Sequence, residues 1–202
     1  PTQLLNDLGL FDYGGGGYHC VYMDDKDIEI FKEKKLTAVT NPASNLKLAS
    51  GIAPISRFLK EGIPVAIGTD GAGSNNCLDM FREMFLVTGL AKYRDMDAAS
   101  TDAIEVLKMA TVNGAKAMGL TGSDVLAPGK YADLIMIDMH QPNMQPINNI
   151  AKNIVYSGSK QNVKMTMIDG KILYEDGKFF IGEDPEKLYA KANEIADRLR
   201  QE

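Results

Sequence analysis

Short apolar runs that alternate with helical patterns constrain the fold of this chain more than any other feature. Three runs of strand length cover residues 18–22, 36–40 and 64–68, and each ends in a loop of polar residues, glycine or proline. Amphipathic segments at 25–34 and 55–60 separate the runs. This alternation predicts βαβ units and a parallel sheet. A complete parallel barrel has eight strands and about 250 residues, so the sheet is either open or the last part of a barrel.

The rest of the chain changes from helices to short strands and back. From Asp79 the pattern is helical as far as Gly119, and Asp102 followed by Glu105 predicts a capping box at the start of one helix. Past Gly122 the pattern predicts strands at 133–138, 153–156, 163–168 and 172–174. The last two flank Asp169-Gly170, a turn typical of hairpins. A closing helix is predicted after Asp184, which can cap it.

Charge and composition exclude several classes of protein. The 202 residues include 22 Lys and Arg against 27 Asp and Glu, a net charge of −5. Nucleic acid and anionic membranes select a concentrated basic face, so neither is an expected partner. No segment approaches the roughly 18 apolar residues of a membrane span, and Cys20 and Cys77 are too isolated for a disulfide framework or a zinc knuckle. We therefore expect a cytoplasmic protein, and because Pro1 opens on a helical pattern, a piece of a longer one.

His19 and Asp70 are the residues best placed for chemistry. Histidine suits metal binding and proton transfer because its pKa lies near neutrality, although a histidine on a strand is more often held by ordinary packing. Asp70 follows the third apolar run, at the edge where parallel sheets and barrels build their sites. A carboxylate there needs a partner, either a divalent cation or a helix N-terminus or lysine. Cys20 is expected to point away from His19, and His140 to lie on the surface.

The glycine clusters do not have the spacing of a phosphate-binding loop. Gly14–Gly17 precedes a strand rather than joining a strand to a helix, and neither G-x-x-x-x-G-K-[ST] nor G-x-G-x-x-G is present. The chain also lacks the G-x-S-x-G of serine hydrolases and the H-x-E with P-C-x-x-C of cytidine-type zinc deaminases. These absences argue against phosphate binding and against both of those enzyme classes.

Four motifs follow one another along the chain. They are Tyr18-His19-Cys20-Val21, the stretch 41–54 that begins Asn41-Pro42, Gly68-Thr69-Asp70-Gly71 with Ser74-Asn75-Asn76, and the stretch 110–134. In this order they resemble the last three barrel strands and the following β domain of the amidohydrolase superfamily. The likeness is greatest to its 5′-methylthioadenosine/S-adenosylhomocysteine deaminase group and that group's triazine-hydrolase relatives, and it covers about residues 8–182.

The resemblance implies an α/β fold, the carboxyl-terminal part of a metal-dependent hydrolase TIM-type (β/α)8 barrel. Residues 1–122 would hold barrel strands six to eight. Residues 123–182 would form part of a small β-sandwich, and residues 183–202 a C-terminal helix.

The resemblance also implies the chemistry. Members hold one divalent metal ion, here expected to be Zn²⁺ with Fe or Mn as alternatives, and hydrolytically deaminate a small-molecule substrate. Asp70 would be the carboxylate that closes the metal site, and it would pass a proton to the departing ammonia. His19 would orient the attacking water and stabilise the tetrahedral centre. Asp70, Asn45 and Ser74 would contact the substrate.

The chain departs from the family in lacking several of its functional residues. The HxH pair after strand one, the strand-five histidine and its nearby glutamate have no counterparts here. We therefore expect the chain alone to be inactive and to associate with itself or as a homo-oligomer, because a partial barrel leaves edges unpaired. Two alternatives remain open: an amidohydrolase for another aminated heterocycle of guanine or triazine type, and a non-catalytic assembly module of the same fold.

Overall fold

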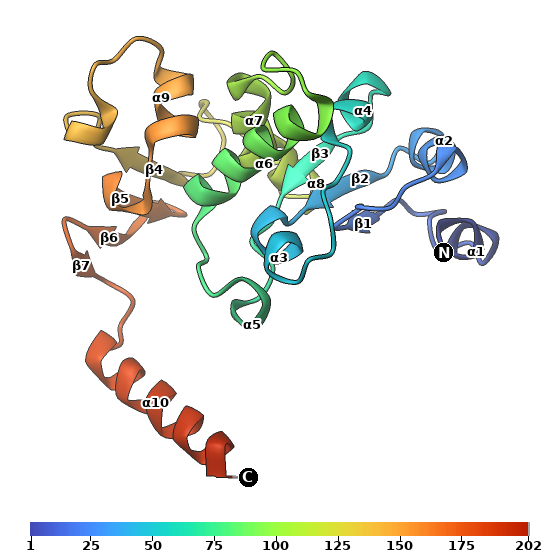
Figure 1. The fold of residues 1–202 in the computed structure, drawn as a ribbon. Helices are drawn as coiled ribbons and strands as arrows, with labels where there is room; N and C mark the ends of the chain where they lie inside the picture. Colours follow the sequence, from blue (N-terminus) through green and yellow to red (C-terminus); the bar gives the residue numbers. More distant parts are fainter. Residues whose placement is uncertain (202) are drawn as a thin grey trace.

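The computed structural model describes residues 1–201, which form two separate sheets and several helices (Figure 1). The first sheet is parallel, with the strand order β1-β2-β3. Its strands are β1 (Gly16–Tyr18), β2 (Thr37–Thr40) and β3 (Val65–Ile67). Helix α2 (Asp25–Glu33) connects β1 to β2, and α3 (Pro42–Lys47) and α4 (Ile55–Lys60) connect β2 to β3. The predicted βαβ arrangement is confirmed.

The first strand lies earlier in the chain than predicted, because it is built on glycine. A side chain at Gly16 would collide with the carbonyl oxygen of Thr37, so only glycine allows β1 to approach β2 this closely. His19 and Cys20 have φ values of 66° and 46°, outside the range of a strand. The strand therefore ends at Tyr18, and the predicted strand over residues 18–22 is wrong beyond that residue.

The core lies where helices cover one face of the parallel sheet. Leu36, Phe58, Val65, Val106 and Met109 are completely buried there. The helices that contact β3 are α4, α6 (Met80–Asp95), α7 (Ala103–Ala110) and α8 (Val112–Ala117). The other face is more open, and a hollow of about 330 Å³ lies over Thr37, Val39 and Ala66. One face of this sheet is thus packed against helices, and the other is partly open to solvent.

Asp102 caps the start of helix α7, as the sequence indicates, but the predicted capping box with Glu105 does not form. The Asp102 carboxylate accepts a hydrogen bond from the Ile104 amide at 2.8 Å. Glu105 instead forms an ion pair with Lys108, 2.6 Å away on the same side of the helix. Residues three apart on a helix are neighbours, so Lys108 is within reach of the Glu105 carboxylate. This ion pair takes the place of the bond from the Asp102 backbone amide that a capping box would need.

The second sheet is antiparallel, with the order β4-β5-β6-β7. Its strands are β4 (Leu134–Ile137), β5 (Val163–Ile168), β6 (Lys171–Glu175) and β7 (Lys178–Phe179). The predicted hairpin is confirmed, with φ values of 49° at Asp169 and 75° at Gly170. Two 3-10 turns lie nearby, η1 (Pro142–Met144) and η2 (Lys160–Asn162).

The strand predicted over residues 153–156 is wrong, because these residues belong to helix α9 (Ile150–Ser157). Asn149 caps this helix by accepting a hydrogen bond from the Lys152 amide at 3.0 Å. Val155 is buried against the main core, which the helical spacing allows. A four-residue apolar run does not distinguish a strand from a buried helix turn. Here the cap at Asn149 favours the helix.

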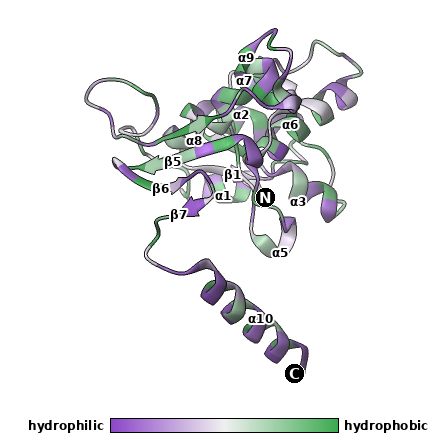
Figure 2. Ribbon diagram, turned by 90° about the vertical axis from the view of Figure 1, so that its left-hand side faces the viewer, coloured by the Kyte–Doolittle hydropathy of each residue, from purple (hydrophilic) through white to green (hydrophobic). Residues whose placement is uncertain are grey.

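Three further helices complete the description: α1 (Thr2–Asp7), α5 (Ala72–Asn75) and α10 (Pro185–Gln201). Helix α10 is the predicted C-terminal helix, and Asp184 caps it by accepting from the Glu186 amide at 3.0 Å. Figures 1 and 2 both show it apart from the rest of the molecule. Its surface mixes hydrophilic and hydrophobic residues (Figure 2), and Leu188 and Leu199 are exposed. Among residues 1–201 no helix combines the length and the apolar character that crossing a bilayer requires.

Candidate active site

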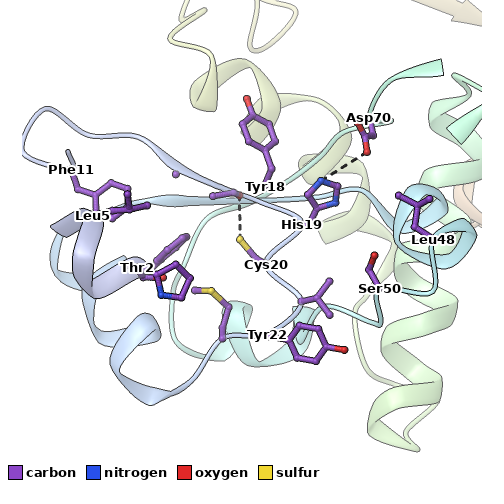
Figure 3. A pocket seen from close by; sticks show the side chains of 16 residues that line it. Thr2, Leu5, Phe11, Tyr18, His19, Cys20, Tyr22, Leu48, Ser50 and Asp70 are labelled. Carbon is purple, nitrogen blue, oxygen red and sulfur yellow. Dashed lines mark hydrogen bonds and ion pairs between the residues drawn. The ribbon is translucent and has the colours of Figure 1, made fainter. Parts of the chain in front are cut away.

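His19 and Asp70 lie together just past the carboxyl ends of β1 and β3 (Figure 3). His19 Nε2 is 3.9 Å from Asp70 Oδ2, and the two side chains are 43% and 31% exposed. This distance exceeds a hydrogen bond, so both groups can contact a third atom. The structure thus brings together the two residues that the sequence singled out.

Asp70 is held by two hydrogen-bond donors. Ser44 Oγ donates to Oδ2 at 2.6 Å, and the Gly71 amide donates to Oδ1 at 2.7 Å. The Ser44 bond first, and then the Gly71 amide and Ser74, lower the pKa of Asp70 to about 2. Asp70 also has a φ of 61°, a left-handed conformation that Asp tolerates better than most residues. At neutral pH the group is therefore an ionised, oriented carboxylate.

His19 is oriented by Asn45. Its Nδ1 lies 2.7 Å from Asn45 Oδ1, an acceptor, so Nδ1 carries the proton and donates. Asn41 satisfies its hydrogen bonds when its amide nitrogen donates to the Gly68 carbonyl oxygen, which leaves its own oxygen on the side of His19 Nδ1. Nε2, on the side of Asp70, is then the nitrogen that can accept a hydrogen bond.

A buried carboxylate lies behind this pair. Glu83, on α6, is completely buried, and its Oε2 accepts from the Ala43 amide at 3.0 Å. Its Oε1 accepts from Asn75 Nδ2 at 2.8 Å, and the same nitrogen donates to the Thr69 carbonyl at 2.6 Å. Sequence reasoning missed Glu83. The sequence did contain an indication that Glu83 is buried. It lies three residues after Met80 and four before Val87, and therefore on the apolar face of the helix.

The other predicted residues have varied surroundings. Asn45 is buried beside His19, and Ser74 Oγ donates to the Gly71 carbonyl at 3.2 Å. Cys20 is buried, its thiol donates to the Gly17 carbonyl at 3.2 Å, and burial raises its pKa to about 11.

His140 is exposed, as expected, and remote in sequence from this group. Within the described part of the chain, Cys20 and Cys77 form no disulfide.

A cavity of about 520 Å³ opens beside His19 and Asp70 (Figure 3). Its size falls within the range of small-molecule sites. Most of the residues around the two polar groups are apolar or aromatic, among them Tyr18, Tyr22 and Leu48. The arrangement can therefore enclose an organic molecule and present it to an imidazole and a carboxylate.

Asp70 fits a metal site as one of several ligands. Its oxygens are ionised, accessible and fixed in orientation, which suits a divalent cation. Zinc sites in enzymes use at least three protein ligands. Among residues 1–201, no three His, Cys, Asp or Glu side chains are grouped so as to hold a metal ion. The chain therefore offers part of a metal site.

Comparison with known proteins assigns the chain to a family. The family model described as "Amidohydrolase family" matches residues 1–173. The chain belongs to the amidohydrolase family. The resemblance stated from the sequence is therefore confirmed. The chain is 42% identical to 5-methylthioadenosine/S-adenosylhomocysteine deaminase of Caldanaerobacter subterraneus subsp. tengcongensis, over 98% of this chain and 46% of that protein.

Two further amidohydrolase relatives agree. The 5′-deoxyadenosine deaminase of Methanosarcina mazei is 41% identical over 98% of this chain and 45% of that protein. The crystal structure of an adenosine deaminase from Xanthomonas campestris, with bound zinc, superposes with a TM-score of 0.93 at 33% identity. That superposition covers 99% of this chain and 46% of the other. The chain thus spans about half the length of the relatives it matches.

Proposed function

We propose that this chain is the carboxyl-terminal part of a metal-dependent amidohydrolase that hydrolytically deaminates an adenosine-type nucleoside, of the 5′-methylthioadenosine or S-adenosylhomocysteine class. The observation that carries the proposal is the meeting of His19 and an ionised Asp70 at 3.9 Å beside a cavity. The names of the relatives support the substrate class. The activity belongs to the full-length protein, because this chain supplies only part of a metal site.

The proposed architecture completes a barrel. Strands β1, β2 and β3 would be barrel strands six to eight, within a portion that ends near residue 122. Residues 123–182 would contribute the antiparallel sheet to a composite sandwich, followed by helix α10. The open sheet face over Thr37 and Val39 and the unpaired outer edge of β1 support this arrangement, because a closed barrel has neither.

The proposed metal is Zn²⁺, in keeping with the zinc in the Xanthomonas campestris structure. Asp70 would bind it together with ligands from outside this chain. When bound, the ion would activate a water molecule for hydrolysis.

The chain's own residues would handle the protons. Water adds to the purine carbon that bears the amine, and the carbon–nitrogen bond then breaks to give a carbonyl group and ammonia. His19 Nε2 would accept a hydrogen bond from the water and orient it for attack, while Asn45 holds its Nδ1. An Asp70 oxygen would receive the water proton and deliver it to the departing amine. Ser44 and the Gly71 amide hold that carboxylate in place.

The test replaces one carboxylate at the site and one remote from it, in the full-length protein. D70N should lower turnover of 5′-methylthioadenosine by roughly 10²- to 10⁴-fold and reduce bound zinc, measured by ammonia release and elemental analysis. D169N is the matched control, because Asp169 is also a left-handed aspartate after a strand, with φ 49°. D169N should leave both the turnover and the amount of bound zinc unchanged.

The outcomes separate the alternatives. If D70N retains its metal and full turnover, the site assignment is wrong. A substrate panel that includes guanine and a triazine tests the substrate class, and activity on one of these alone would shift the assignment to another aminated heterocycle. A full-length protein without turnover or metal would indicate an assembly module of the same fold.

A further inference from the structure

Glu83 has no role in the chemistry proposed above, although it is a carboxylate buried completely inside the protein. Burial raises its pKa, and the hydrogen bonds from the Ala43 amide and Asn75 act in the opposite direction. A buried carboxylate is costly unless donors satisfy it. The burial of Glu83 is therefore tolerated only because hydrogen-bond donors satisfy its two carboxylate oxygens.

The two oxygens of Glu83 bind the two halves of the site. Oε2 accepts from the amide of Ala43, in the first turn of α3. The next residue, Ser44, donates to Asp70. The residue after that, Asn45, accepts from His19. Helix α3 thus carries the direct supports of both reacting groups, and Glu83 anchors its start.

The other oxygen leads to Asp70 from the opposite side. Oε1 accepts from Asn75 Nδ2 at 2.8 Å, and that nitrogen also donates to the Thr69 carbonyl at 2.6 Å. Thr69 directly precedes Asp70. One buried side chain therefore connects helix α3 to the turn that presents Asp70.

We propose that Glu83 is a positioning residue, which holds helix α3 and the Thr69–Asp70 turn against each other and so sets the separation of His19 and Asp70. The inference rests on the proposed function, because this separation affects a reaction only if these two groups carry it out. Glu83 itself lies behind the site and acts through Ser44, Asn45 and Asn75.

The chemistry of the contacts explains why a carboxylate is needed. Both groups that face Glu83 are N–H donors, so the side chain between them must accept twice. Glutamine has nearly the same shape but one acceptor and one NH₂ group. In E83Q, that NH₂ would face either the Ala43 amide or Asn75 Nδ2, donor against donor. One of the two connections would then break with little change in packing volume.

The experiment measures E83Q in the full-length, zinc-loaded protein. We expect kcat and Zn²⁺ affinity to fall about 10- to 100-fold, with KM changed by less than about threefold. Zinc affinity is measured by competition with a chelator. The folded fraction at the assay temperature, measured by circular dichroism, should match that of the unmodified protein.

T88V is the matched control on the same helix. Thr88 is also completely buried, and its hydroxyl donates to the Thr101 carbonyl at 3.1 Å, away from α3 and α5. Removing this bond should lower the melting temperature but leave kcat and Zn²⁺ affinity per folded molecule unchanged. A structural role alone would give E83Q the same behaviour as T88V.

The remaining outcomes decide between the two proposals. Wild-type kcat and Zn²⁺ affinity in E83Q, while D70N is inactive, would overturn the positioning role alone. Full activity in D70N would overturn the proposed function instead. If E83Q does not fold, N75A removes the connection between Glu83 Oε1 and the Thr69 carbonyl, while Glu83 itself and its bond from the Ala43 amide stay in place. N75A should show the same loss of kcat and Zn²⁺ affinity at nearly constant KM, and wild-type values would contradict the proposal.

Discussion

At the scale of single residues, the surroundings of two side chains fix their protonation in opposite directions. Hydrogen bonds from Ser44 and Gly71 lower the pKa of Asp70 from 3.8 to about 2. A carboxyl group with a lowered pKa stabilises the folded state above its unfolded pKa, and the contribution is lost as the pH falls from about 4 towards 2. Cys20 is the reverse case, because burial raises the pKa of its thiol from 9.0 to about 11. Its contribution to stability is complete below pH 9 and is lost as the pH rises towards 11.

This difference predicts the reactivity of the cysteines. Cys20 is buried, whereas Cys77 is partly exposed. At pH 8 the raised pKa leaves Cys20 with roughly 100-fold less thiolate than a thiol of ordinary pKa. Iodoacetamide should therefore label Cys77 first, as followed by peptide mass spectrometry over time. Equal labelling rates at pH 8 would show that Cys20 is not shielded.

At the scale of elements, the outer strand of the parallel sheet depends on a residue without a side chain. Gly16 pairs with Thr37, and a Cβ atom would collide with the Thr37 carbonyl oxygen. G16A should lower the free energy of unfolding by about 1–3 kcal/mol, the usual cost of overpacking. Chemical denaturation measures this.

Gly89 provides the control for that prediction. It lies within helix α6, and an added Cβ would meet no atom within 4 Å. G89A should stabilise the protein by up to about 1 kcal/mol, because alanine is the better helix former. A G16A protein as stable as the wild type would mean that β1 does not pair with β2 as described.

The sequence predicts elements well where periodicity is strong and poorly where contacts decide. Strands β2 and β3 and the hairpin at Asp169-Gly170 follow from apolar runs and turn residues, and Asp70 was identified because it follows such a run. The start of β1 at Gly16 was missed, because glycine has no strand preference of its own and only the approach to β2 explains it. Helix α9 was missed because a short apolar run is ambiguous. Glu83 was missed because its apolar helix face does not reveal its partners, one of which, the Ala43 amide, lies 40 residues away in the sequence.

At the scale of the whole molecule, the chain has surfaces that are typical of interfaces. In residues 1–201, β1 and β3 are the outer strands of a three-stranded sheet. Exposed apolar side chains lie on α1 and α10, among them Leu4, Leu188 and Leu199. Unpaired edges and apolar patches of this kind favour association.

We predict that the isolated chain associates with itself at micromolar concentration. Sedimentation velocity should show dimers or larger species instead of a 22.1 kDa monomer. Adding the remaining part of the barrel as a separate polypeptide should reduce this association, because it would cover the same surfaces. A stable, monodisperse monomer would contradict the prediction.

The contacts of helix α3 also affect what a ligand finds when it reaches the site. The groups that orient His19 and Asp70 all lie between residues 41 and 83. In the folded protein both side chains are therefore already held in place, and their conformational entropy is lost before a ligand binds. A ligand that arrives later meets an imidazole and a carboxylate already facing it, so its binding is opposed by less side-chain ordering.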